Sequence, residues 1–375
     1  MNRVKINLKN SSYFLFFGLS LALPMGIYTL TSGPSRIIAN KAHNNHWSEN
    51  SENFVQKIII VVFCVLIFIA SLYLTRYFII LKSNIKKYII FGICATSLLT
   101  ALYIFTFKPE ILIVKSTEKV IIEKNTAIEF HFGSYPDEDK MANLVAEKYT
   151  AIISLLHPLV IPAEPVLMEK ELKSAKKLRL KIISIPMLPW IIGNDSAVSQ
   201  IKKLAHNAKG KYYVHCYLGK DRVNVFRNII EKENKNIKIN SHFTTRNLDT
   251  ISRFERGNIY KLDEDCYLTP YPTDEEFFSF ILNGKIKSVV SLLHSNKAEN
   301  KNRRINEEKI MTLYNQSYYN IPILESDSDL KIKEAVAYIK KLPKPIIIHE
   351  YSSESIISNR FRGIFQEKSK NTLLK

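Results

Sequence analysis

A histidine, a cysteine and an arginine stand at a spacing that suits phosphoryl transfer. His215 and Cys216 follow an apolar, β-prone run at residues 211–214, and Arg222 opens a segment of helical composition six positions after the cysteine. A strand, a short turn and a helix N-terminus bring backbone N–H groups to one point, where the helix dipole adds positive potential. The spacing therefore predicts a cradle for a tetrahedral dianion.

Within this cradle the cysteine is the candidate nucleophile. Positive potential at a helix N-terminus favours the thiolate form of a cysteine, and a thiolate attacks phosphorus. Arg222 can return across the turn and bind two phosphoryl oxygens. The alternative for Cys216 is a small buried hydrophobic residue. The groups expected to hold the phosphate belong to Tyr217, Leu218, Gly219, Lys220, Asp221 and Arg222.

The sequence His215-Cys216, five residues, then Arg222 resembles the signature loop of the cysteine-dependent protein tyrosine and dual-specificity phosphatases. The Gly-Lys-Asp-Arg ending is similar to bacterial tyrosine phosphatases and to phosphoinositide phosphatases. The resemblance covers one α/β unit, about residues 115–230. It implies that Cys216 forms a phosphocysteine, that Arg222 and the loop amides stabilise the equatorial oxygens, and that His215 supports the thiolate. Water then hydrolyses the intermediate, and neither a metal nor a cofactor is implied.

Three positions around the loop leave alternatives open. The family takes the leaving-group proton from an upstream Asp, and the first carboxylate after the apolar run at residues 185–188 is Asp195. Asp195 can be this general acid or the N-cap of the following helix, with Asp221 as a second candidate donor. Val223 stands where relatives usually carry Ser or Thr, so the phosphocysteine can form yet hydrolyse slowly. Lys220 can contact the substrate or remain a solvated charge.

The segment around this loop occurs twice in the chain. Residues 152–157 (Ile-Ile-Ser-Leu-Leu-His) recur as residues 289–294 (Val-Val-Ser-Leu-Leu-His), and residues 212–215 align with residues 346–349. Residues 135–139 likewise recur as 271–275, and residues 185–188 recur as 321–324. All four motifs follow in the same order with nearly equal spacing. Such register predicts two copies of one domain.

We therefore expect two tandem α/β domains of the tyrosine and dual-specificity phosphatase-like fold, at residues 115–235 and 250–366, each a mostly parallel sheet flanked by helices. The expected order in each copy is strand, helix, strand, helix, strand, loop, helix. The second copy carries Glu350, Ser353 and Ile356 in place of the cysteine, glycine and arginine. A carboxylate repels an anion, so this copy is expected to be an inert packing or regulatory domain, with a repurposed catalyst at Glu350 as the alternative.

The first third of the chain is apolar enough to cross a membrane. A hydrocarbon core of about 30 Å needs about 20 apolar residues, and only a helix satisfies the backbone of an isolated span. We expect three such helices, at residues 13–30, 58–80 and 88–107, within a membrane region at 1–110. Lys and Arg in the N-terminal tail and in the 82–87 turn slightly favour a non-cytoplasmic α/β region.

Charge and composition limit the partners. The 375 residues include 53 Lys and Arg against 35 Asp and Glu, for a net charge of +18. The Lys residues are scattered and no zinc-finger or RNA-binding pattern occurs, so membrane lipid rather than nucleic acid is the expected partner. Together these features indicate a membrane-anchored, cysteine-dependent phosphatase for phosphotyrosine-type protein or phosphorylated lipid. The alternative is a pseudophosphatase that binds phosphorylated partners without turnover.

Overall fold

The computed structural model describes residues 8–31, 33–35, 37–38, 49–113, 128–234, 246–295 and 298–372. The chain forms two compact units, Met1–Val114 and Lys115–Lys375. The expected limits of the first α/β domain, at 115 and 235, lie outside the described residues. The same holds for residues 1–7, whose charges contribute to the expected sidedness.

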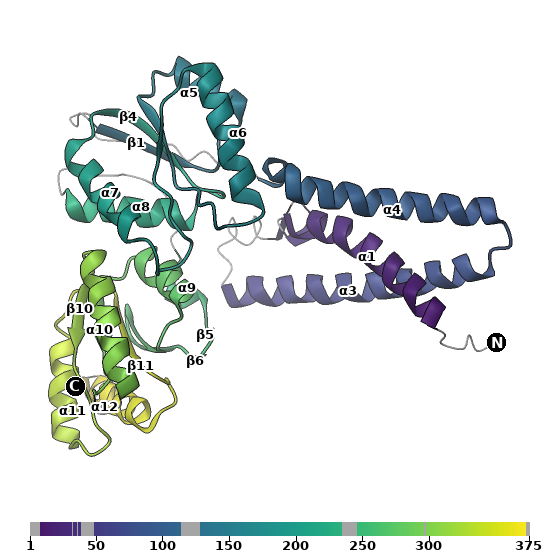
Figure 1. The fold of residues 1–375 in the computed structure, drawn as a ribbon. Coiled ribbons are helices and arrows are strands. Elements are labelled where there is room, and N and C mark those ends of the chain that lie inside the picture. The colour runs from purple at the N-terminus through teal and green to yellow at the C-terminus, as the bar shows by residue number, and fades with distance from the viewer. Residues whose placement is uncertain are drawn as a thin grey trace. The chain divides into compact units, whose positions relative to one another are not determined.

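The described part of the first unit consists mainly of three long apolar helices, α1 (Leu8–Thr31), α3 (Glu49–Ile80) and α4 (Asn84–Phe107), followed by the short helix η1 (Pro109–Leu112) (Figure 1). Aromatic contacts join the helices, as where Phe16 of α1 stacks on Phe91 of α4. Segments Ser11–Thr29, Phe54–Ile80 and Asn84–Phe107 are long and apolar enough to span a membrane. The expectation of three apolar helices is therefore confirmed by length and composition.

The second unit begins with a parallel sheet. Its strands are β1 (Ile128–Gly133), β2 (Ala151–Ser154), β3 (Ile182–Ser184) and β4 (Gly210–His215), in the order β1-β4-β2-β3. Continuous apolar runs such as Ile152-Ile153 are buried, as expected of parallel strands covered on both faces. The helices that alternate with the strands are α5 (Glu138–Ala146), α6 (Ala163–Leu178), α7 (Asp195–Asn207) and α8 (Asp221–Glu233).

A mixed sheet follows, in the order β10-β9-β11-β8-β7. Its strands are β7 (Tyr260–Asp263), β8 (Cys266–Pro270), β9 (Ser288–Ser291), β10 (Ser317–Asn320) and β11 (Ile346–Glu350), with β7 antiparallel to β8. The helices of this half are η2 (Leu248–Thr250), α9 (Asp274–Glu276), η3 (Phe277–Leu282), α10 (Ala298–Leu313), α11 (Asp329–Ile339) and α12 (Ile356–Thr372). A small hairpin, β5 (Arg253–Phe254) and β6 (Gly257–Asn258), precedes the sheet.

The two halves of the second unit share one strand order, since β8-β11-β9-β10 reproduces β1-β4-β2-β3. Matching backbone hydrogen bonds recur: Leu155 N donates to His215 O, and Leu292 N donates to His349 O, both at 2.9 Å. Each half contains four parallel strands, so the expected order with three strands is wrong. The opening strand β1 was missed because Glu129 and a histidine interrupt its apolar run.

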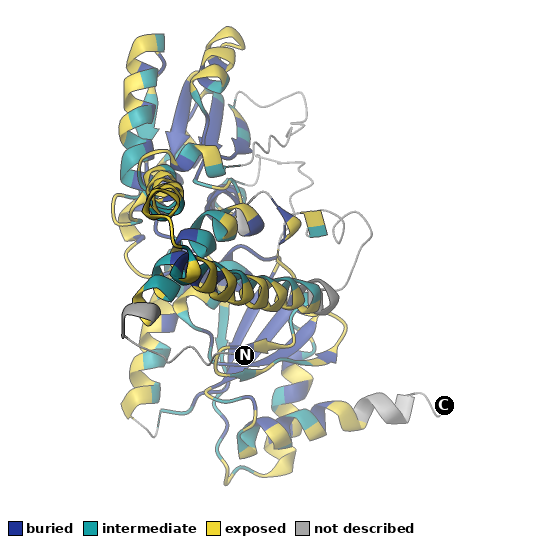
Figure 2. Cartoon of the chain, turned by 90° about the vertical axis from the view of Figure 1, so that its right-hand side faces the viewer, coloured by how far each residue is buried: buried dark blue, intermediate teal, exposed yellow. Residues whose placement is uncertain are grey.

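The two halves also share a hydrophobic core. Phe226 and Ile230 of α8 belong to the same buried cluster as Phe278 and Ile281 of η3. Asn228 on α8 adds a hydrogen bond of 2.6 Å from its side-chain nitrogen to the backbone oxygen of Leu282. Figure 2 shows that the strands of both sheets are buried, whereas the outer faces of the helices are exposed. The helix that begins at the candidate phosphate loop is therefore packed on the second half.

Candidate active site

The loop at residues 216–220 leaves the carboxyl end of β4, a strand with neighbours on both sides, and leads into α8. Gly219 holds the loop against the end of β1. Its φ is +68°, and a Cβ at this position would lie 2.3 Å from the carbonyl carbon of Gly133 and 2.4 Å from Ser134 N. Only glycine accepts both the positive φ and this close approach. The glycine therefore fixes the path of the loop over the neighbouring strand.

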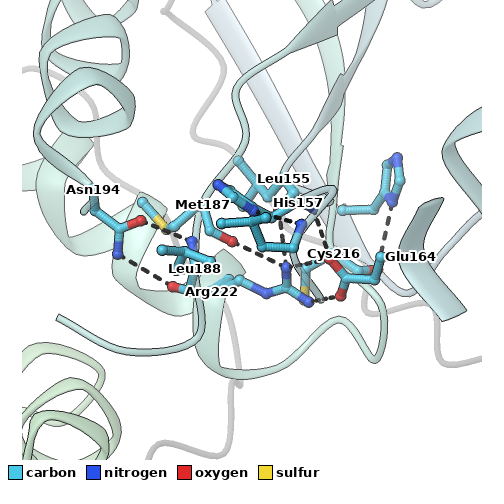
Figure 3. A network of polar contacts seen from close by, with 10 residues as sticks. Leu155, His157, Glu164, Met187, Leu188, Asn194, Cys216 and Arg222 are labelled. Atoms are coloured by element: carbon cyan, nitrogen blue, oxygen red, sulfur yellow. Dashed lines mark hydrogen bonds and ion pairs between the residues drawn. The ribbon is translucent and has the colours of Figure 1, made fainter. Parts of the chain in front are cut away.

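The side chains of Cys216 and Arg222 meet inside this loop (Figure 3). Both are buried, at 3% and 6% exposure, and the Cys216 sulfur lies close enough to the guanidinium to affect its charge. Burial alone would lower the pKa of Arg222, but the pKa is raised because the Cys216 sulfur and the Glu164 carboxylate lie beside the positive charge. The sequence-predicted nucleophile and phosphate ligand are thus neighbours.

Arg222 is anchored by a carboxylate that the sequence analysis did not identify. Its Nη1 donates to Glu164 Oε2 at 3.0 Å, and its Nη2 donates to Glu164 Oε1. Nη1 also lies 3.1 Å from the backbone oxygens of Leu155 and Met187, which follow β2 and β3. These four bonds do not use Nε. The guanidinium therefore returns across the loop as expected, but its outer nitrogens bind protein groups.

His215 is paired with a second buried carboxylate. Its Nε2 lies 2.7 Å from Glu171 Oε1, and Ser154 donates to the other Glu171 oxygen at 2.8 Å. In the second half His349 Nε2 and Glu307 Oε1 lie 2.6 Å apart, and the other Glu307 oxygen accepts from Tyr318 at 3.2 Å in place of a serine. The histidine before each loop is thus joined to the long helix of its own half, α6 or α10. Matching glutamates upstream of the two histidines are the signal that could have predicted the pair.

Asp195 lies at the start of α7, and the alternative that it is the N-cap is wrong. The N-cap is Asn194, whose side chain accepts from Leu188 N at 2.7 Å and donates to the Trp190 oxygen at 2.7 Å. Asp195 is the first helical residue and is exposed. Its negative charge interacts favourably with the helix dipole at this end. Its role as general acid remains a prediction.

His157 is a further titratable side chain at this edge of the sheet (Figure 3). Its backbone N donates to Glu164 Oε2 at 2.7 Å, and its Nδ1 accepts from Leu159 N at 3.1 Å. Partial burial lowers the pKa of His157, and the positive charge of Arg222 lowers it further against the opposing effect of Glu164. Both effects favour the neutral imidazole.

The remaining predicted loop residues have distinct surroundings. Asp221, the first residue of α8, accepts hydrogen bonds from Arg246 at 3.1 and 3.2 Å and from Asn283 at 2.6 Å. Its carboxylate is thus used to join the loop to the second half. Lys220 is exposed, whereas Val223 is fully buried in the shared core.

The equivalent loop of the second half presents no cation. Glu350 is 8% exposed and accepts from Ser352 N at 2.9 Å, in the position equivalent to the nucleophile. Ile356 is exposed on the first turn of α12, and residues 350–356 contain no Lys or Arg. The residues of this loop therefore supply a carboxylate and no positive charge for an anion, and the nearby Arg303 packs on the Tyr351 ring.

Within the described residues no group of three or more His, Cys, Asp and Glu side chains is placed to hold a metal ion, and all four cysteines are free. Comparison of the chain with protein-family models, with curated proteins and with solved structures finds no match. The loop between β4 and α8 is therefore the main indication of what this chain does.

Proposed function

We propose that this chain is a membrane-anchored, cysteine-dependent phosphatase that hydrolyses phosphomonoesters. The observation that carries the proposal is the contact between the Cys216 sulfur and the Arg222 guanidinium at the N-terminus of α8. A nucleophile, a fixed cation and the backbone N–H groups of a helix N-terminus are together the requirements for a phosphocysteine mechanism.

The proposed reaction has two displacements. The Cys216 thiolate attacks phosphorus, the bond from phosphorus to the ester oxygen breaks, and that oxygen takes a proton from a donor, for which Asp195 is the candidate. Water then attacks the phosphocysteine, which releases inorganic phosphate and restores the thiolate. Arg222 and the amides of residues 217–222 would stabilise the equatorial oxygens in both steps. His215, held by Glu171, would support the thiolate.

The finer description of the fold belongs to the same proposal. We take the two halves as duplicates of the tyrosine and dual-specificity phosphatase-like fold, the second having lost its chemistry. Support comes from the common strand order and from the buried histidine–glutamate pair in each half. Three apolar helices of sufficient length support the membrane anchor.

Hydrolysis of p-nitrophenyl phosphate by the purified full chain tests the proposal. Cys216→Ser and Arg222→Lys should each abolish turnover, while the wild type should remain active in a metal chelator. Lys309→Arg, an exposed change on α10, serves as the control. Activity that survives Cys216→Ser, or that the chelator removes, would refute the mechanism.

A second candidate function is binding of phosphorylated partners without turnover. The specific observation in its favour is Val223, whose buried side chain has no hydroxyl to stabilise the leaving thiolate. Rapid mixing separates the two functions. An enzyme gives a burst of p-nitrophenol followed by steady turnover, whereas a binding protein retains phosphopeptide or phosphorylated lipid and releases no phosphate.

A further inference from the structure

The carboxyl edge of the first sheet exposes large apolar side chains around the candidate phosphate loop. Leu159 and Ile161 follow β2, Ile192 follows β3 and Leu218 follows β4, with exposures of 69%, 78%, 61% and 49%. Among the described residues of 128–233, only Val145 and Leu172 are other large hydrophobic residues with comparable exposure. Because the carboxyl ends of parallel strands meet at one edge, these four residues form an apolar rim beside the loop.

The three loops that carry the apolar rim also lack negative charge. Residues 155–162, 185–194 and 216–220 contain no Asp or Glu, and Lys220 is their only Lys or Arg. Surface loops are usually polar, and a contiguous exposed apolar patch marks an interaction surface. Trp190, half-buried in the middle loop, is of the residue type that gathers at the boundary between lipid and water. Two of these loops are followed directly by an aspartate, Asp195 at the start of α7 and Asp221 at the start of α8, and the charge of Asp221 is paired with Arg246.

We propose that the apolar rim contacts the lipid bilayer and that the phosphoester presented to Cys216 is the head group of a phosphorylated lipid. The inference rests on the proposed phosphatase function and adds its substrate class. Three features on the same chain select a bilayer over a phosphopeptide as the partner. The chain carries three apolar helices of membrane-spanning length, its net charge is +18, and the exposed Lys220 complements anionic lipid.

Contact of the rim with lipid would also serve catalysis. Insertion of Leu159 and Ile192 among head groups places the loop at the depth of a lipid phosphate, so the substrate needs no extraction from the bilayer. A phosphopeptide in water would gain little from four exposed aliphatic side chains, because recognition of a peptide also needs polar side chains around an apolar centre, and the three loops carry few of them.

Substrate competition in one bilayer tests this inference. The full chain is reconstituted in phosphatidylcholine vesicles and assayed on long-chain phosphatidic acid in the same bilayer, on soluble p-nitrophenyl phosphate and on a phosphotyrosine peptide. The variant Leu159→Ser with Ile192→Ser should lose about tenfold activity on phosphatidic acid and retain its activity on p-nitrophenyl phosphate. Leu172→Ser, equally exposed but on the side of α6, should change neither activity.

A measurement independent of turnover accompanies the assay. The chain has two tryptophans, so Trp47→Phe leaves Trp190 as the only indole. Acyl chains brominated near the head group should quench Trp190 fluorescence, and the rim variant should reduce the quenching. Absence of quenching in the chain with the native rim would overturn bilayer contact. This result does not depend on whether the rim variant folds.

The outcomes separate the two proposals. Preference for the phosphopeptide, with equal activity of the rim variant and wild type on phosphatidic acid, overturns the lipid inference and leaves the phosphatase intact. Absence of turnover on every ester refutes the phosphatase and with it the lipid substrate, while the quenching still decides whether the rim meets the bilayer.

Discussion

Glu164 and Arg222 bind each other through both carboxylate oxygens and both outer guanidinium nitrogens, although 58 residues separate them in the chain. The second half has neither partner at the equivalent positions. Glu164 lies two helical turns before Glu171. The residue two turns before Glu307 on α10 is Asn300, and Ile356 stands in place of the arginine. The histidine–glutamate pair, in contrast, persists in both halves. The pair of Glu164 with Arg222 therefore occurs only in the half that carries the candidate site, whereas the histidine–glutamate pair is common to both halves.

Removal of the Glu164 charge should disable the site and destabilise the fold. Both side chains are nine-tenths buried or more, so Glu164→Ala leaves an unpaired guanidinium and should cost about 3–5 kcal/mol of unfolding free energy. The milder Glu164→Gln should lower kcat on p-nitrophenyl phosphate by about tenfold or more, because the guanidinium loses its fixed plane. Glu169→Ala, exposed on the same helix, is the control. Unchanged kcat in Glu164→Gln would contradict a positioning role.

An alanine at position 219 should disrupt the loop. Gly219→Ala places a Cβ against the backbone of Gly133 and forces an L-residue to a φ of +68°, so a loss of at least about 2 kcal/mol is expected. Gly363→Ala is the matched change, because that glycine is helical with no atom within 4 Å of the added carbon. It should stabilise α12 by about 0.5–1 kcal/mol. Thermal unfolding of the two variants measures both effects, and equal melting temperatures would contradict the strained loop.

A hydroxyl after the arginine should speed breakdown of the intermediate. Val223→Thr has nearly the same shape, and by the resemblance to the phosphatase loop its hydroxyl would stabilise the leaving thiolate of Cys216. We expect a severalfold higher steady-state rate after the burst, with a loss of about 1–2 kcal/mol in stability because Val223 is fully buried. Val225→Thr, buried in the same core but further along α8, should show the stability loss without the faster steady state. An unchanged steady-state rate would contradict the role assigned to position 223.

The burial of Cys266 at the start of β8 should make folding stability fall at alkaline pH. Burial raises the pKa of this thiol from 9.0 to about 12. The unfolded chain therefore loses the thiol proton first, and folding stability falls as pH rises above 9.0, by up to about 1.4 kcal/mol per pH unit. Cys266→Ala should remove this part of the pH dependence. Alkylation followed by mass spectrometry should show the rate of native Cys266 still rising above pH 10, where the thiol in urea has levelled off.

Local patterns in the sequence were sufficient for several elements. Uninterrupted apolar stretches predicted the three long helices, since length and composition alone define a candidate span. The apolar run before His215 and the helical composition after Arg222 predicted β4 and α8, because both elements form from neighbouring residues. Self-comparison predicted two related halves, whose strand orders agree.

Features that depend on distant contacts were not predicted. Nothing near Glu164 distinguishes this residue from the solvated glutamates of an ordinary helix, and only packing of α6 against the loops pairs it with Arg222. The position of Asp195 one residue inside its helix depends on Asn194, whose side chain binds the preceding loop. The shared core likewise depends on the contact of α8 with η3, which neither half specifies alone.

The packing of α8 on η3 gives the second half a structural role that needs no chemistry of its own. The second half covers Phe226 and Ile230, so deletion of residues 250–366 would expose an apolar helix face directly behind the candidate phosphate loop. Under the proposed function, substitutions in the loop of the second half would be tolerated, whereas substitutions on the face that packs on α8 would not. Selection for activity in the first half would therefore also preserve the second half.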